Sequence, residues 1–208
     1  RLIREVAPAV ARAAMETGVA TRPITDFDAY LEQLDRFVFR SGLLMRPLFD
    51  QARADKKRIV YAEGEDERVL RAAKAVIDEG VGIPILIGRP KIVQRRVERL
   101  GLNFKPGEDC EIINPQDDPR YRDYWKLYHS LAERKGVSPD EARTRVRTNT
   151  TVIAALALMR GDADAMICGT EGRYDRHLQH VQDVVGLRSD VQDLSAVSVL
   201  ILSKGTIF

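Results

Sequence analysis

The residues best suited to binding chemistry form a short glycine-containing segment, residues 169–173 (GTEGR). An apolar run precedes it and a stretch with helical spacing follows, so the segment joins a strand to a helix. Ligands of open α/β sheets bind where strands end, and helix amides together with Arg173 could hold a phosphate. Glu171 counts against an anion, and the alternative is a tight turn that needs two glycines. The candidate contacts are Gly169, Gly172 and Arg173.

A run of alternating arginines is the second candidate for anion binding. On a helix Arg143 and Arg147 share a face while Arg145 points away, and two guanidinium groups on one face suit a phosphate. The alternative is a solvated helix surface, because Asp140 and Glu141 lie at a spacing that allows ion pairs with the arginines. Arg143 and Arg147 therefore join the candidate binding residues.

Two histidines, His177 and His180, lie three residues apart near Asp175 and Asp183, a spacing that superficially suits a metal. A metal site needs further ligands from other elements, and the sequence names none, so surface or interface histidines are the better interpretation. No serine–histidine–aspartate or cysteine–histidine arrangement follows from the spacing of residues. We predict no catalytic residue, no cofactor-binding residue and no metal ligand in this chain.

An acidic turn in residues 58–74 (RIVYAEGEDERVLRAAK) connects a buried strand to a helix. The turn consists of Glu63, Gly64, Glu65 and Asp66. Its carboxylates would stabilise a helix N-terminus and repel a phosphate, so the turn is interpreted as a structural joint. No G-x-G-x-x-G follows a strand anywhere in the sequence, and no nucleotide site is predicted.

The bulk composition excludes several classes of partner. Lys and Arg number 33 against 31 Asp and Glu, and the two signs are interspersed, so neither nucleic acid nor a membrane is an expected partner. No apolar run is long enough to span a bilayer. The two cysteines, Cys110 and Cys168, are expected to be reduced thiols of a cytoplasmic protein. The chain begins at Arg1, without a methionine, which suggests a fragment of something longer.

Helices are expected ahead of any strand. Residues 2–16 place apolar side chains on one face, and a second helix follows Pro23. Thr25 or Asp26 can cap this second helix, and Gly42 can close it.

A charged stretch, residues 53–58 (RADKKR), marks the expected domain boundary. We predict a helical segment over residues 1–52 and a second domain over residues 53–208. The second domain alternates strands and helices, which predicts an α/β fold with a mostly parallel sheet and helices on both faces.

The elements of this domain follow from apolar runs and caps. Strands are expected at residues 59–62, 83–87, 111–113, 165–168 and 197–202. Helices are expected before Gly80, from Lys91 to Gly101, after Pro119, after Pro139 and from Tyr174 to Val185. The two cap-then-proline starts predict two helices between Asp118 and Arg160. A hairpin through Ser203, Lys204 and Gly205 should return the chain into Thr206.

Several strings resemble the phosphate acetyltransferase family: YAEGEDERVLRAA (61–73), GIPILIGRP (82–90) and RGDADAMICG (160–169). Others are similar to the version of that domain fused behind bacterial malic enzymes, of the NADP-dependent type. These are NPQDDPRYRDYW (114–125), VRTNTTVIAALALMRGDADAMICG (146–169) and LSAVSVLILSKGTIF (194–208). Residues 4–24 resemble the last helices of the malic enzyme part. The resemblance implies an isocitrate dehydrogenase-like fold, here incomplete.

The resemblance also implies a function for the parent protein. It would oxidise and decarboxylate malate to pyruvate with NADP or NAD and Mg or Mn. Acetyl-CoA would bind the appended domain as an inhibitor, with Gly169, Gly172, Arg173, Arg143 and Arg147 as candidate effector contacts. The domain would also join subunits into a homodimer or a higher oligomer.

One departure from the family pattern favours a domain that has kept the fold and dropped the chemistry. Gln179 stands where the acetyltransferases carry an arginine in a T-x-D-T-V-R-P string, and glutamine cannot replace a bidentate anion clamp. The alternatives are an active phosphate acetyltransferase, which would convert acetyl-CoA and phosphate to acetyl phosphate and coenzyme A, and a purely structural dimerisation module.

Overall fold

The computed structural model describes residues 2–38, 42–198, 200–202 and 205–207. Contacts divide the chain into two compact units, residues 52–194 and residues 1–51 together with 195–208. The predicted domain boundary between residues 52 and 53 stays a prediction.

The smaller unit contains helices and a hairpin. Helix α1 (Leu2–Glu16) is followed by α2 (Phe27–Val38), which Asp26 caps by accepting hydrogen bonds from the amides of Asp28 and Ala29. The prediction that Gly42 closes α2 is wrong, because α2 ends at Val38 and Gly42 begins α3 (Gly42–Ala54). A proline inside α3, Pro47, and the charged residues at its end made this helix hard to recognise in the sequence.

A two-stranded antiparallel hairpin, β5 (Leu200–Leu202) with β6 (Gly205–Ile207), completes this unit. The prediction of a hairpin is confirmed, although its turn residues Ser203 and Lys204 lie outside the described residues. The prediction of a strand over residues 197–202 begins too early, because residues 197 and 198 are not part of a strand and β5 begins at Leu200; residue 199 lies outside the described residues.

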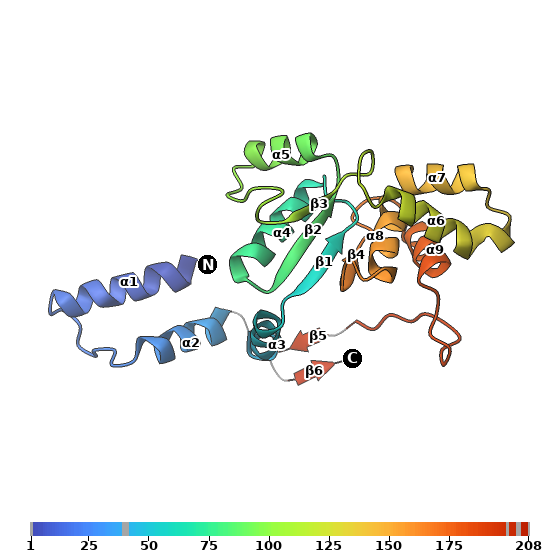
Figure 1. Cartoon of the computed structure of the whole chain (residues 1–208). Helices are drawn as coiled ribbons and strands as arrows, with labels where there is room; N and C mark the ends of the chain where they lie inside the picture. Colours follow the sequence, from blue (N-terminus) through green and yellow to red (C-terminus); the bar gives the residue numbers. More distant parts are fainter. Residues whose placement is uncertain (1, 39–41, 199, 203–204, 208) are drawn as a thin grey trace. The chain divides into compact units, whose positions relative to one another are not determined.

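The larger unit is built on a four-stranded parallel sheet with the order β3-β2-β1-β4 (Figure 1). Its strands are β1 (Lys57–Tyr61), β2 (Gly82–Ile87), β3 (Glu111–Ile113) and β4 (Ala165–Ile167). The predicted strands and their parallel pairing are confirmed. Because parallel strands run in one direction, their carboxyl ends all meet at the same end of the sheet.

Helices cover both faces of this sheet, as predicted (Figure 1). On one face Tyr61 and Leu86 pack in a core with α4 (Glu67–Glu79) and α5 (Pro90–Arg99). On the other face Val60 and Ile85 belong to a core shared by four helices. These are α6 (Tyr121–Ala132), α7 (Pro139–Thr148), α8 (Thr150–Met159) and α9 (Tyr174–Val184). Burial of this alternating apolar pattern fixes which face each strand residue takes.

The region between Asp118 and Arg160 holds three α-helices, so the prediction of two is wrong. Asn149 ends α7 with an extended backbone and, at the same time, caps α8 by accepting a hydrogen bond from the amide of Val152 (3.1 Å). Helix α8 is apolar on all sides and buried, so it shows no helical period that could separate it from α7.

No helix among the described residues is both long and apolar enough to cross a membrane. Both cysteines are free, and they lie on opposite faces of the sheet, Cys110 in the core with α4 and α5 and Cys168 against the other core.

Candidate functional site

The candidate site lies at the carboxyl end of the sheet, where the β1–α4 turn (residues 62–66) meets the β4–α9 loop (residues 168–173). Gly64 brings the turn onto the end of the neighbouring strand, because its amide donates to the carbonyl oxygen of Ile87 (3.0 Å). A Cβ atom at Gly64 would lie 2.7 Å from backbone atoms of Ile87, so no other residue fits there without moving a strand.

Two carboxylates of the turn serve the structure. Asp66 caps α4 by accepting from the amide of Arg68 (2.8 Å), and its hydrogen bonds to the Arg68 guanidinium hold the pKa of the carboxyl far below its usual range. Glu65 accepts two hydrogen bonds from the guanidinium of Arg89, both 2.8 Å, and this pair lowers its pKa as well. The interpretation of these two acids as a structural joint is consistent with these contacts.

Glu63 has a different role. Its Oε1 accepts a hydrogen bond from the amide of Gly169 in the β4–α9 loop (3.0 Å), 106 residues away in sequence. Its Oε2 is buried and has no hydrogen-bond partner among the described residues. Arg68, in the first turn of α4, makes a second contact with the β4–α9 loop by donating a hydrogen bond to the carbonyl oxygen of Thr170 (3.0 Å). Glu63 therefore links the loops and keeps one unused acceptor between them.

The two histidines of α9 bind the amino end of α8. His177 lies 2.8 Å from the hydroxyl of Thr151 through Nδ1, and its Nε2 donates to the carbonyl oxygen of Glu171 (2.6 Å). His180 Nε2 lies 2.7 Å from the side-chain amide nitrogen of Asn149. Burial lowers the pKa of His180, and the charge of Arg145 lowers it further.

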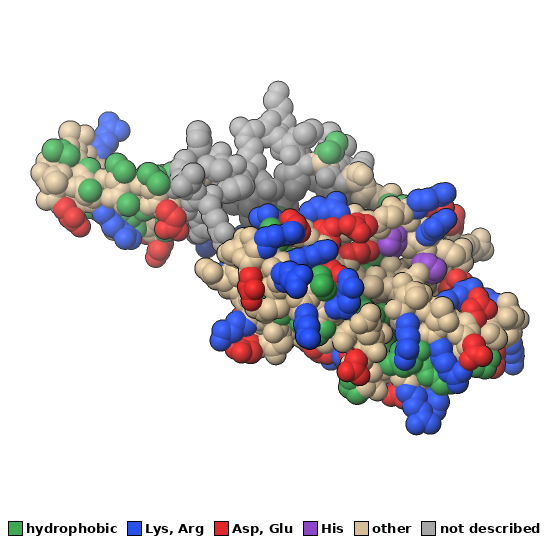
Figure 2. Space-filling model, turned by 90° about the horizontal axis from the view of Figure 1, so that it is seen from above, with side chains coloured by type: hydrophobic (Ala, Val, Ile, Leu, Met, Phe, Trp, Pro, Cys, Tyr) green, Lys and Arg blue, Asp and Glu red, His purple; other side chains and the backbone are tan. Residues whose placement is uncertain are grey.

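No group of three or more histidine, cysteine, aspartate or glutamate side chains is placed to hold a metal in the part of the chain that the structure describes. Figure 2 shows histidine side chains beside acidic ones on the face seen from above, with basic side chains mixed among them. The face carries both signs of charge rather than one continuous basic surface.

The predicted binding loop has a more restricted geometry than its sequence indicated. Gly169 and Gly172 both have a left-handed backbone, with φ of +95° and +94°, but the Gly169 amide is already bonded to Glu63. Arg173 is exposed and pairs with Asp175 (2.7 Å). An anion at this loop would have to displace both carboxylates, so effector binding by Gly169, Gly172 and Arg173 stays a prediction.

The other predicted contacts lie on α7 against α6. The guanidinium of Arg143 stacks 4.3 Å from the ring centre of Trp125, and that of Arg147 stacks 4.5 Å from the ring centre of Tyr121. Arg143 also pairs with Asp140, as the alternative reading of a solvated surface expected. The two arginines thus share a face, and their role in effector binding stays a prediction.

Arg145, which helical spacing places away from the face of Arg143 and Arg147, also contacts α6, because it donates to the hydroxyl of Tyr128 (2.8 Å). It also pairs with Glu141 on its own helix, as expected. Gln179, the residue that departs from the acetyltransferase pattern, is exposed on α9 and donates to Asp183 (3.1 Å).

Sequence reasoning placed Glu63 in a structural turn without its role in the site, and it missed Asn149 and Thr151. Asn149 precedes two threonines and an apolar run, which is a recognisable helix-cap signal. The contacts of Glu63 and Thr151 gave no local signal, because their partners, Gly169 and His177, are far away in the sequence.

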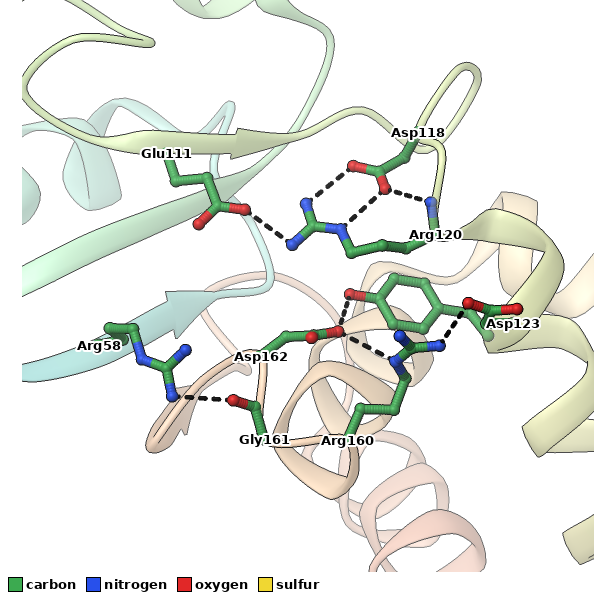
Figure 3. A network of polar contacts seen from close by, with 9 residues as sticks. Arg58, Glu111, Asp118, Arg120, Asp123, Arg160, Gly161 and Asp162 are labelled. Carbon is green, nitrogen blue, oxygen red and sulfur yellow. Dashed lines mark hydrogen bonds and ion pairs between the residues drawn. The ribbon is translucent and has the colours of Figure 1, made fainter.

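The amino end of the sheet carries a second polar cluster (Figure 3). Arg120 pairs with Asp118 (2.9 Å) and Glu111 (2.7 Å), and the hydroxyl of Tyr124 donates to Asp162 (2.9 Å), which also pairs with Arg160. Burial raises the pKa of Tyr124. Each of these side chains is paired, and the cluster offers no free group for a ligand.

Comparison with known proteins identifies close relatives of this chain. It is 60% identical over 209 residues to an NAD-dependent malic enzyme of Rhizobium meliloti and 48% identical over 208 residues to an NADP-dependent malic enzyme of Escherichia coli. Both matches cover 100% of the chain and 27% of the relative, so the chain spans about a quarter of the curated relatives' length. A phosphate acetyltransferase of Nitratidesulfovibrio vulgaris is 28% identical over 155 residues, which cover 74% of the chain and 21% of that protein.

Solved structures agree with the fold. A phosphotransacetylase from Staphylococcus aureus matches with a TM-score of 0.63 at 22% identity, over 72% of this chain and 45% of that one. A phosphotransacetylase from Streptococcus pyogenes matches with a TM-score of 0.60 at 26% identity, over the same shares. The family model described as phosphate acetyl/butaryl transferase matches residues 43–208. The chain therefore belongs to the phosphate acetyl/butaryl transferase family, and the resemblance inferred from its sequence is confirmed.

Proposed function

We propose that this chain is the regulatory and subunit-joining part of a cytoplasmic malic enzyme. The parent enzyme oxidatively decarboxylates malate to pyruvate with NAD or NADP and a divalent metal. Acetyl-CoA binds the phosphate acetyltransferase-like domain and inhibits the reaction. The chain itself performs no catalytic step.

One observation carries this proposal. The similarity to malic enzymes extends over the whole chain, whereas the family model begins at residue 43 and the match to a phosphate acetyltransferase covers 74% of the chain. The helices of residues 1–42 therefore accompany the domain in malic enzymes and are not part of the acetyltransferase family model.

The site geometry supports a regulatory rather than a catalytic domain. At the carboxyl end of the sheet, the amide of Gly169 already donates a hydrogen bond to Glu63, and Arg173 forms an ion pair with Asp175. An acyl phosphate would need these donors to be free, because its charge requires amides and guanidinium groups around it. A larger effector could compete for the donors with contacts elsewhere on its surface.

The test uses the full-length protein with malate, either NAD or NADP, and Mg²⁺ or Mn²⁺. We expect pyruvate and reduced nucleotide, and a rate that falls as acetyl-CoA is added. Arg173→Ala should weaken inhibition by about tenfold, the usual worth of a charge-assisted hydrogen bond, while Arg122→Ala on the exposed face of α6 leaves it unchanged. A protein that does not turn over malate contradicts the proposal.

Two further measurements separate the alternatives. Formation of acetyl phosphate from acetyl-CoA and phosphate by the full-length protein would favour an active acetyltransferase, for which the family membership is the supporting observation. Calorimetry with acetyl-CoA separates regulation from scaffolding, because a stable oligomer that releases no heat and keeps its malate kinetics would be a purely structural module.

A further inference from the structure

A hydrogen bond between Asn149 and His180 holds helix α9 on the amino end of α8, and its geometry fixes the protonation state of the His180 imidazole. The Oδ1 atom of Asn149 accepts from the amide of Val152 (3.1 Å) as the cap of α8, so the nitrogen of the same side chain must face His180. That nitrogen can only donate, and it lies 2.7 Å from Nε2 of His180. Nε2 must therefore accept, which requires a neutral imidazole.

Protonation of His180 would place an N–H group against the N–H groups of Asn149. The contact can be restored only if Asn149 rotates its amide, and the rotation would take the cap away from α8. Acid therefore weakens either the hold of α8 on α9 or the start of α8 itself.

The charged groups around His180 do not compensate for this loss. Arg145 of α7 and Arg176 of α9 oppose a positive charge there, as does a protonated His177. Asp183 favours the charge, but its Oδ1 already accepts hydrogen bonds from Lys135 (3.0 Å) and Gln179 (3.1 Å). Burial and the positive neighbours outweigh Asp183 and lower the pKa of His180.

Helix α9 is also hydrogen-bonded to the β4–α9 loop. The Nε2 of His177, one turn before His180, donates to the carbonyl oxygen of Glu171 in that loop (2.6 Å). A Cβ atom on the next residue, Gly172, would lie 3.0 Å from the same nitrogen. Loosening of α9 thus also loosens the loop.

We propose that the hydrogen bond between Asn149 and His180 is an acid-sensitive latch that holds α9 and the β4–α9 loop on α8. Since the folded protein binds the His180 proton more weakly than the unfolded chain does, the latch is fully closed above the usual histidine pKa of about 6.5. It weakens below that value and is lost as the pH falls through the lowered pKa of His180. The latch is independent of whether acetyl-CoA is the effector, because it concerns contacts within the fold.

Hydrogen–deuterium exchange of the full-length protein tests the latch, with rates corrected for the intrinsic effect of pH. Between about pH 7.5 and about pH 5.5, on either side of the usual histidine pKa, peptides from Tyr174–Val184 should lose protection by at least roughly fivefold. His180→Gln supplies a neutral oxygen acceptor to Asn149 and should remove most of this loss. The matched control is His129→Gln on α6, whose histidine faces Glu133 (3.8 Å), and it should behave as the wild type.

A second variant should reverse the direction in which the protection of α9 changes with pH. In Asn149→Asp the helix cap is kept, but the group facing His180 becomes a carboxylate oxygen, which accepts from a protonated imidazole. Protection of α9 should then rise, not fall, as the pH is lowered. Wild-type protection that does not change with pH would overturn the proposal, as would a His180→Gln variant that keeps the full loss. If Asn149→Asp does not fold, the comparison of His180→Gln with His129→Gln decides alone.

Discussion

The two ends of the parallel sheet use polar residues in opposite ways. At the amino end, the arginines, acids and tyrosine of the cluster pair with one another (Figure 3). At the carboxyl end, Glu63 keeps a buried oxygen without a partner among the described residues, and His180 accepts from an amide as a neutral group. The amino end has its hydrogen-bonding capacity used up, whereas the carboxyl end retains capacity that a ligand or a proton can use.

Arginines lower the pKa of acids at both ends, but groups whose neutral form is favoured lie at the carboxyl end of this comparison. At the amino end, hydrogen bonds from Arg58 lower the pKa of Asp164 to about 2, so the pair is charged at neutral pH. At the carboxyl end, burial and the nearby charge of Glu63 raise the pKa of the Cys168 thiol, and burial lowers that of His180. Ion pairs thus hold the amino end, whereas the carboxyl end combines the ion pairs of Glu65 and Asp66 with groups that are held in their neutral form.

The largest expected effect comes from the amino end. Arg120→Met leaves Asp118, whose side chain is 7% exposed, and Glu111 without their guanidinium partner. Breaking such a buried pair should lower the free energy of unfolding by about 3 kcal/mol. Urea denaturation of the 208-residue chain, followed by fluorescence of Trp125, its single tryptophan, measures the change. Arg122→Met, on the exposed side of α6, should stay within about 0.5 kcal/mol, and equal losses in both variants would show that the pairing is not the cause.

Gly64→Ala tests whether the β1–α4 turn at the carboxyl end of the sheet is rigid. The new Cβ atom would lie 2.7 Å from backbone atoms of Ile87, so the turn or the end of β2 must move, at a cost of about 2 kcal/mol. Gly136→Ala is the matched control, since its Cβ meets no atom within 4 Å and only the left-handed backbone (φ +87°) is strained, at about 1 kcal/mol. The same denaturation curves compare the two, and a Gly64 variant as stable as the control would mean that the turn can move freely.

Asp66→Ala tests the acidic turn as a helix cap. Loss of the hydrogen bond to the Arg68 amide should cost about 1 kcal/mol at neutral pH. Because the pKa of Asp66 is lowered in the folded protein, its contribution is complete above the usual carboxyl value of about 4 and is lost as the pH falls towards the folded value. The gap between wild type and variant should therefore close in acid, and a gap that persists at low pH would contradict the role of the charge.

Much of the fold could be predicted from the sequence because its signals are local. Apolar runs, caps and glycines lie within a few residues of the element they define, as Asp66 and Gly80 do at the two ends of α4. The signals failed at two residues that can end one helix or begin the next. Asn149 ends α7 and begins α8, and Gly42 begins a helix where a helix end was expected.

The candidate site could be located from the sequence only as a loop at the end of a strand. The topology of a parallel sheet brings residues 168–173 to the carboxyl end, and that much follows from alternating strands and helices. The sequence does not show which group accepts the hydrogen bond of the Gly169 amide. The acceptor, Glu63, comes from the end of another strand, and the register between β1 and β4 decides the contact. The carboxylate that a sequence argument assigns to a helix end is, in the fold, a bridge between two loops.

Glu63→Gln gives the smallest expected change and the sharpest test of the difference between the two ends. Glutamine keeps an oxygen for the amide of Gly169 and replaces a buried carboxylate oxygen that has no described partner, so the free energy of unfolding should change by less than about 0.5 kcal/mol. Glu63→Ala, which removes the acceptor, should cost about 1 kcal/mol. If glutamine instead costs as much as Arg120→Met, the Glu63 charge fastens the fold, and the carboxyl end is as structural as the amino end. If Glu63→Gln costs little, the charge of Glu63 is not needed for stability, and the carboxylate can interact with a ligand at the β4–α9 loop.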